Sequence, residues 1–125
     1  MIPLDTTTRK LQAFLSGAAA TTNPKVTVSF YDIPRGSKTD SSEYLRSTQF
    51  TVLAGTTETD ICAAPLAQGT VRNIEYINIY NADTASVTVT VCVDDNGTNQ
   101  IQVVMTLATT ESAVWSKNSG WQIVT

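Results

Sequence analysis

Few side chains in this sequence could carry out chemistry. The 125 residues contain no histidine and only two cysteines, Cys62 and Cys92. Without histidine, the chain lacks the commonest general base and metal ligand and cannot form a Ser-His-Asp or Cys-His arrangement. Two cysteines alone also cannot complete a four-ligand zinc site. We therefore expect a protein that is not an enzyme and that uses no metal and no cofactor.

The acidic run Asp94-Asp95-Asn96 is the remaining chemical candidate, because clustered oxygen ligands can bind calcium. It lacks the spaced ligands of a calcium loop, and the following Gly97 makes it typical of a tight hairpin turn, which we favour. For Cys62 and Cys92 we expect reduced, buried thiols, with a disulfide between them as the alternative.

Composition favours strands and a protein partner. Charged residues make up 15% of the chain, below the roughly 25% of ordinary soluble domains, and threonine is abundant. The net charge is −3 and the eight Lys and Arg residues are scattered, so we expect no nucleic-acid partner. The N-terminus lacks the features of a signal peptide and no apolar run approaches a membrane span. These observations predict synthesis in the cytoplasm and no membrane partner.

The clearest strand is Ser86–Val93, in which four valines alternate with threonine and cysteine and are expected to face the core. The Asn96-Gly97 pair predicts a type I′ turn into a second strand, Gln100–Ala108. In that strand alternate residues from Ile101 to Leu107 form one apolar face, while Val104 makes the opposite face partly apolar. Such a strand is often central or covered by a neighbouring subunit.

The remaining pattern is a series of short strands. Thr8–Gly17 fits either a helix or a strand, and we favour a strand that forms a hairpin with the next one. Residues Val71 to the C-terminus are expected to form a five-stranded meander, and Pro34–Glu43 is the longest loop. The other predicted strands are Lys25–Ile33, Ser47–Leu53, Glu58–Ala63, Val71–Tyr80, Ala113–Trp115 and Trp121–Val124.

Together these elements predict an all-β fold, an antiparallel β-barrel or β-sandwich (β-tulip-like) of about eight or nine short strands. Residues 1–125 form one domain in this prediction, with residues 1–7 as an extended N-terminal arm. Strands that are apolar on both sides suit a symmetric assembly better than a monomer, so we expect a homotrimer.

Several segments resemble small virion proteins of tailed bacteriophages: Leu4–Leu11, Val71–Thr84, Val87–Val89, Asp95–Thr98 and Gly120–Val124. The resemblance covers a little over half of the chain and contains no catalytic or ligand signature. It implies a head decoration, or cement, protein: a small β-barrel or β-sandwich subunit, often homotrimeric, on the outer capsid surface. There it would stabilise the shell by bridging major capsid proteins.

The attachment points that we expect are the N-terminal segment and the loop Pro34–Glu43. Residues 1–4 are apolar and precede the strands above, and the following Arg and Lys are the only adjacent cations. The candidate capsid-contact residues are Met1, Ile2, Pro3, Leu4, Arg9, Lys10, Arg35 and Lys38.

Two other functions stay open: a head-fibre or tail-fibre receptor-binding domain, and a head–tail connector or tail component. A receptor-binding domain could use aromatic side chains as stacking platforms for sugars. Core packing and subunit contacts explain these aromatic residues more simply; they are Tyr31, Tyr76, Tyr80, Trp115 and Trp121.

Overall fold

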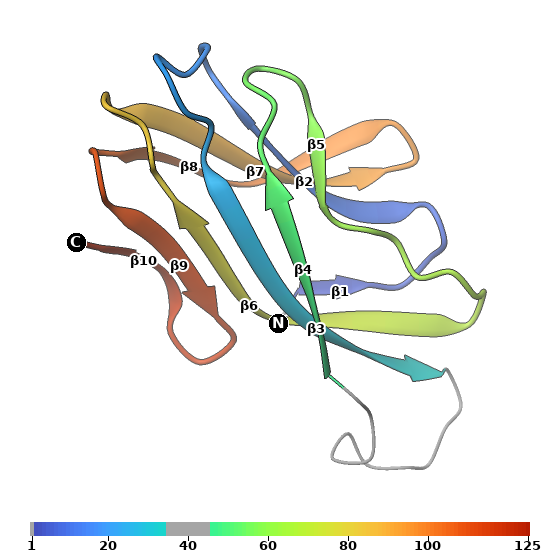
Figure 1. Ribbon diagram of the computed structural model, residues 1–125. Coiled ribbons are helices and arrows are strands. Elements are labelled where there is room, and N and C mark those ends of the chain that lie inside the picture. The colour runs from blue at the N-terminus through green and yellow to red at the C-terminus, as the bar shows by residue number, and fades with distance from the viewer. Residues whose placement is uncertain (1, 35–45) are drawn as a thin grey trace.

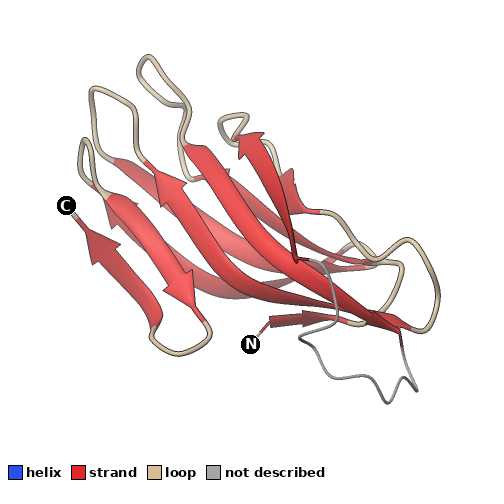
Figure 2. Ribbon diagram, turned by 60° about the horizontal axis from the view of Figure 1, so that its bottom comes forward, coloured by secondary structure: helices blue, strands red, loops and turns tan. Residues whose placement is uncertain are grey.

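The computed structural model describes residues 2–34 and 46–125, and this part of the chain contains ten strands and no helix (Figure 2). The strands form two antiparallel sheets that pack face to face (Figure 1). The predicted all-β sandwich is confirmed, and the sheets do not close into a barrel.

The larger layer, sheet A, has the strand order β10-β9-β6-β3-β4, with β1 paired to the other end of β6. Its strands are β1 (Ile2–Leu4), β3 (Lys25–Pro34), β4 (Arg46–Val52), β6 (Thr70–Tyr80), β9 (Ser112–Ser116) and β10 (Gly120–Val124). Sheet B has the order β5-β2-β7-β8. Its strands are β2 (Arg9–Leu15), β5 (Thr59–Cys62), β7 (Val87–Asp95) and β8 (Thr98–Leu107).

Alternating apolar residues build the core between the sheets, as the sequence pattern predicted. In β7, Val87, Val89 and Val91 are buried and Val93 packs against them. Within Thr8–Gly17, residues Arg9–Leu15 form the strand that we favoured, and its inward residues are buried in the core between the sheets. Burial of each Val or Leu stabilises the fold by about 1.5–3 kcal/mol, so the core sets the register of both sheets.

Two predicted strand pairings are wrong. The chain from β6 onward is not a meander, because β6 pairs with β3 and β9 in sheet A whereas β7 and β8 lie in sheet B. The predicted hairpin between β2 and β3 is also absent, since β2 pairs with β5 and β7. Both connections cross from one sheet to the other, which buries the apolar faces of the successive strands against each other.

The hairpin β7–β8 is confirmed. Asn96 and Gly97 have φ angles of 51° and 94°, the left-handed pair that a type I′ turn requires. The Gly97 N–H also donates to Asp94 Oδ1 over 3.1 Å, so the acidic run serves as the turn that we favoured. A bulge at Gln102 shifts the register, because Cys92 pairs with Ile101 and the preceding Val91 pairs with Val103.

Two buried polar residues hold the crossover from β6 to β7. Asn81 donates from Nδ2 to the carbonyl oxygens of Ala85, Leu107 and Ala108 and accepts from the N–H of Asp83. The Asp83 carboxylate accepts from the backbone N–H groups of residues 20, 21, 22 and 84. These bonds join three separate connections at one end of the sandwich.

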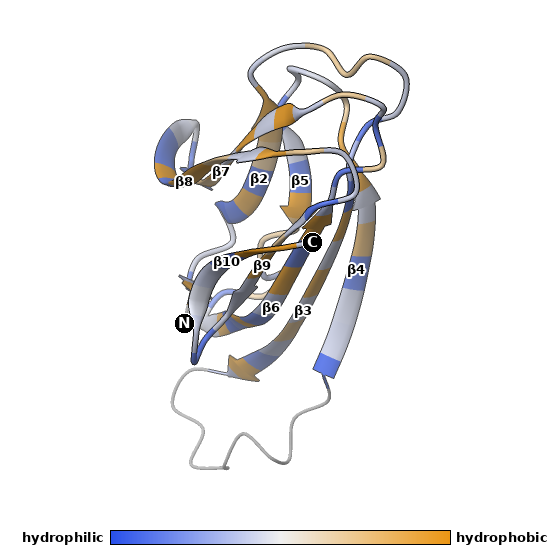
Figure 3. Ribbon diagram, turned by 90° about the vertical axis from the view of Figure 1, so that its left-hand side faces the viewer, coloured by the Kyte–Doolittle hydropathy of each residue, from blue (hydrophilic) through white to orange (hydrophobic). Residues whose placement is uncertain are grey.

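The two long sides of the sandwich differ. On one side β4 lies against β5, and Gln49 bridges the two sheets by donating to the Asp60 carbonyl and accepting from the Ala63 N–H. On the other side β8 and β10 are the last strands of their sheets (Figure 3). Each therefore has one edge with no ladder partner among the described residues.

Candidate interaction surfaces

The outer face of sheet B carries exposed apolar side chains. Residues that pair across antiparallel strands share a face, so Phe14, Thr90 and Val104 lie in one outward row. The next outward row contains Cys92 and Ile101. Ile101 is 64% exposed and Val104 is 55% exposed. Sequence periodicity placed Ile101 on the inner face, and the bulge at Gln102 is the reason why this prediction is wrong.

The outer face of sheet A carries a second apolar area. Phe50 pairs with Thr27, and Val52 and Tyr80 both pair with Lys25, so these side chains occupy two adjacent outward rows. Phe50 is 77% exposed and Val52 is 58% exposed. Phe50 was not among the contact residues predicted from the sequence. Its position between the polar Gln49 and Thr51 in a predicted strand would have marked it as a candidate.

The expectation that Ile2 and Leu4 lie in an extended, exposed arm is wrong. These residues form β1, which pairs with residues 72–74 of β6, and both side chains are buried in the core. Only Pro3, which faces outward in this strand, is exposed. The apolar N-terminus is thus covered by the chain itself, because it completes the edge of sheet A beside β6. Met1 lies outside the described residues, as do Arg35 and Lys38.

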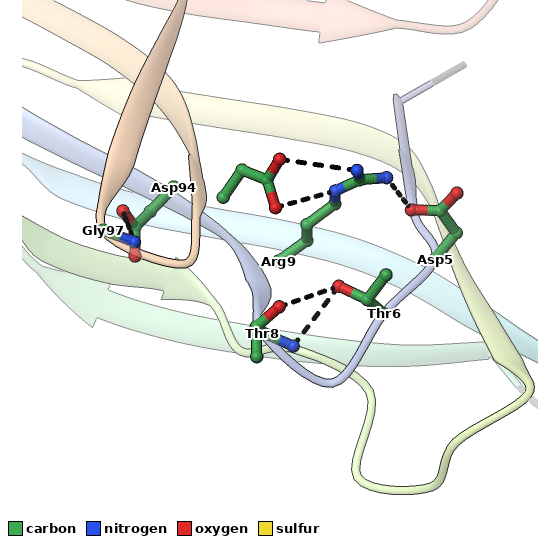
Figure 4. A network of polar contacts seen from close by, with 7 residues as sticks. Asp5, Thr6, Thr8, Arg9, Asp94 and Gly97 are labelled. Atoms are coloured by element: carbon green, nitrogen blue, oxygen red, sulfur yellow. Dashed lines mark hydrogen bonds and ion pairs between the residues drawn. The ribbon is translucent and has the colours of Figure 1, made fainter.

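Arg9 is held in a network of polar contacts within the chain (Figure 4). Its Nε lies 3.1 Å from Asp95 Oδ1, its Nη2 lies 3.4 Å from Asp95 Oδ2, and its Nη1 contacts Asp5. The hydrogen bonds that Arg9 donates to Asp95 and then to Asp5 raise the pKa of the guanidinium. This cation therefore tethers the N-terminal segment to the β7–β8 hairpin.

Lys10 also has a partner in the chain. Its Nζ lies 3.4 Å from Asp60 Oδ1, which also accepts a 2.7 Å hydrogen bond from Gln12 Nε2. The two adjacent cations of the predicted capsid contact are thus both paired with carboxylates. Such exposed pairs contribute about 0–1 kcal/mol each, so an acidic partner could still compete for them.

An open groove of about 320 Å³ separates β1 from the start of β8. Ile2 and Pro3 line one wall, Gln100 and Gln102 line the other, and Arg9 lies at its end. The groove belongs to the same open side of the sandwich as the free edge of β8. Its lining combines apolar side chains and glutamine amides with the ion pair between Arg9 and Asp95.

The cysteines are free and buried, as expected. Burial raises the pKa of Cys62 to about 11, although the neighbouring Arg72 acts in the opposite direction. Burial also raises the pKa of Cys92 to about 11. Both groups are therefore neutral thiols at pH 7, whereas the reactive form of cysteine is the thiolate.

The tryptophans of the C-terminal hairpin pack inward. Trp115 and Trp121 pair directly across β9 and β10, Trp115 is buried and Trp121 packs against the core. They lie beside each other against the core, so neither forms a surface platform. Of the tyrosines named above, Tyr31 is buried and Tyr80 is 38% exposed.

Within residues 2–34 and 46–125, no group of three or more Cys, Asp or Glu side chains is placed to hold a metal ion. The same residues include no helix long and apolar enough to cross a membrane. Comparison of the chain with protein-family models, curated proteins and solved structures found no match. The interaction surfaces are therefore described by their own chemistry: two apolar sheet faces and two open strand edges.

Proposed function

We propose that this chain is a non-enzymatic structural protein of a tailed-phage virion, which decorates the outside of the head and bridges major capsid proteins. The observation that carries the proposal is the exposure of apolar side chains on the outer faces of both sheets. Phe50, Val52, Ile101 and Val104 are all more than half exposed. Phe50 and Val52 lie two residues apart on the same face of β4, and exposed apolar side chains grouped in this way favour a protein–protein contact.

We assign the capsid contact to the outer face of sheet A, around Phe50. This face combines the apolar residues with Lys25 and with hydroxyl and amide side chains. An apolar core surrounded by polar groups is the usual composition of a stable interface. The phage assignment itself is supported by the resemblance of the sequence to small virion proteins.

The test uses the phage that encodes the chain. Heads made without this gene product are incubated with the purified protein, and the complexes are separated by sedimentation and imaged by electron cryomicroscopy. We expect added density on the outer head surface. Density on the tail or portal would support the alternative of a tail component or connector instead, and absence of the protein from virions would refute the proposal.

Two matched variants test the assigned face. Phe50→Lys replaces a 77% exposed apolar side chain on sheet A, and Leu66→Lys does the same at a 95% exposed position between β5 and β6. Phe50→Lys should weaken head binding by at least tenfold, and Leu66→Lys should leave it unchanged. Equal binding by both variants would show that this face does not contact the capsid.

A receptor-binding fibre domain is the second candidate, because exposed Phe50 and Tyr80 lie in adjacent rows on one face of sheet A. Aromatic rings on a flat surface can stack against sugars. In this case the purified protein should bind host cells or host glycans, and Phe50→Lys should abolish that binding. Head binding with no affinity for the host surface would exclude this candidate.

A further inference from the structure

The tip of the β7–β8 hairpin contains the one Asn-Gly pair of the sequence, Asn96-Gly97. After an asparagine, the backbone nitrogen of the next residue can attack the side-chain carbonyl carbon, and glycine has no Cβ to hinder that approach. Both residues are exposed. Among the described residues, no atom beyond the chain neighbours of Gly97 lies within 4 Å of the position that a Cβ would take there. The space around the reacting atoms is therefore open.

We propose that Asn96 is a site of spontaneous deamidation, a covalent modification that needs only water. The Gly97 nitrogen gives its proton to hydroxide and uses the electron pair to bond to Asn96 Cγ. The Cγ–Nδ2 bond then breaks, and the amide nitrogen leaves as ammonia after taking a proton from water, which regenerates hydroxide. The product is a five-membered succinimide ring. Water opens this ring at Cγ to give aspartate, or at the backbone carbonyl carbon to give isoaspartate.

The other asparagines of the chain are less suited to this reaction. Asn73 and Asn81 are buried. The nitrogen that follows Asn23 belongs to a proline and has no proton to lose. Three more asparagines precede residues that have a side chain: Asn78, Asn99 and Asn118. Of these, Asn118 is the best comparison for Asn96, because it is an exposed residue in the turn between β9 and β10.

The Asp94 carboxylate slows the reaction in the native turn. Its Oδ1 accepts a 3.1 Å hydrogen bond from the Gly97 N–H, the group that must lose its proton before the attack (Figure 4). The carboxylate holds this proton and repels the negative charge that its loss would leave on the nitrogen. At such a separation in water, repulsion between two unit charges slows a step by up to about tenfold.

Isoaspartate at this position would disturb the hairpin and its contact with the N-terminal segment. It directs the backbone through Cβ and adds one methylene group to a two-residue loop, whose type I′ geometry matches the twist of the flanking strands. Asp95 is the last residue of β7 before this loop, and it pairs with Arg9, which also contacts Asp5. We therefore expect modified protein to have a lower Tm than unmodified protein.

The test follows the purified protein at pH 8 and 37 °C over several weeks. Each deamidation raises the mass by about 1 Da, and peptide mapping by mass spectrometry identifies the residue and distinguishes isoaspartate from aspartate. We expect Asn96 to react several-fold faster than Asn118, and its rate to rise with pH because the attacking nitrogen must be deprotonated. If Asn96 reacts no faster than Asn118, the inference is overturned.

Two variants test the chemistry at the turn. Asn96→Gly removes the reacting amide but leaves a Gly-Gly pair, which also suits a type I′ turn. This variant should keep its Tm during the incubation in which wild type loses Tm. Asp94→Asn keeps an acceptor oxygen of the same shape and removes only the charge, so Asn96 should react faster in it, by up to about tenfold.

An equal fall in Tm for Asn96→Gly and wild type would show that the modification does not disturb the hairpin. A rate in Asp94→Asn that equals the wild-type rate would show that the charge of Asp94 does not slow the reaction. Both measurements use the free protein, so their outcome is independent of the proposed function. In a virion the subunits would not be replaced after assembly, and modified turns would accumulate with the age of the particle.

Discussion

Replacement of Asn81 by alanine should destabilise the protein strongly without touching an exposed surface. The side chain is fully buried, and its Nδ2 lies 3.0 Å from the carbonyl oxygens of Ala85 and Leu107 and 3.1 Å from that of Ala108. Its Oδ1 accepts a 2.9 Å bond from the Asp83 N–H. The amide has two hydrogens for three carbonyls, so these contacts amount to about three full hydrogen bonds.

At about 1 kcal/mol for each bond, Asn81→Ala should lower the free energy of unfolding by about 3 kcal/mol. The buried carbonyl of Leu107, left without its donor, adds to this loss. In a domain of this size each kcal/mol lowers Tm by about 4 °C, so we expect Tm to fall by about 10–15 °C. Calorimetry and urea unfolding measure the change. Asn118→Ala, at an exposed turn residue, is the control and should change stability by less than about 0.5 kcal/mol.

Asn81→Asp separates hydrogen bonding from packing. It keeps the shape and the acceptor oxygen but replaces the donor with a carboxylate directed at three carbonyl oxygens. At pH 7 it should therefore destabilise the protein at least as much as alanine does. The reasoning is refuted if Asn81→Ala costs less than about 1 kcal/mol or if Asn81→Asp is tolerated.

Four further predictions concern the core, the turn and pH. Val89→Asp should abolish soluble expression, because it buries an unpaired carboxylate at a fully buried site; recovery of folded protein would contradict the assigned inner face. Gly97→Val should lower Tm more moderately, since valine disfavours the φ of 94°, and an unchanged Tm would argue against the type I′ turn. Leu4→Ala should cost about 2–5 kcal/mol in urea unfolding if β1 is part of the core, and almost nothing if β1 is a free arm. Burial raises the pKa of the Asp83 carboxyl, but the hydrogen bonds from Thr21, Ala20 and Thr22 outweigh this and hold it well below its usual range. The stabilising contribution of the Asp83 carboxylate is therefore complete above the pKa of about 3.9 that Asp has in the unfolded chain, and it declines as pH falls below that value. The difference in Tm between wild type and Asp83→Asn should accordingly shrink between pH 7 and pH 2.5.

Strand positions could be predicted from this sequence because they depend on local alternation. The alternating valines of β7 predicted the strand because burial selects one face. The Asn96-Gly97 pair predicted the turn because both residues tolerate positive φ angles. β1 was missed because three residues with a central proline carry no periodic signal. Its partner in β6 lies about seventy residues further along the chain, and local patterns hold no information on such a distant contact.

Strand pairing was harder to predict than strand position. The sequence Asn81-Ala82-Asp83-Thr84 has the composition of a hairpin turn, which led to the meander. In the structure Asn81 and Asp83 are buried and bind two other connections, β2–β3 and β8–β9, so the same residue types serve a crossover between sheets. Composition shows that the chain changes direction there, but the burial of these side chains decides which strand comes next.

The candidate interaction surfaces could not be predicted for the same reason, because local patterns do not show which side chains the tertiary fold buries. Whether the odd or the even residues of a strand face outward depends on the sheet it joins and on any bulge, and the bulge at Gln102 reversed this for Ile101. Phe50 is part of a clear strand, yet its 77% exposure follows from the position of β4 at the edge of sheet A.

The burial of β1 changes where attachment to a capsid should be sought. A terminal anchor has to leave the subunit in order to bind, but withdrawal of β1 would remove the buried Leu4 from the core and uncover Ile74, which pairs with Ile2. The cost of losing such a buried side chain is about 2–5 kcal/mol, a large part of a total stability of about 5–15 kcal/mol. Exposed Phe50 and Val52 require no such rearrangement, because they are already in water in the free subunit. Attachment through a sheet face is therefore the mode that this fold supports at the lower free-energy cost.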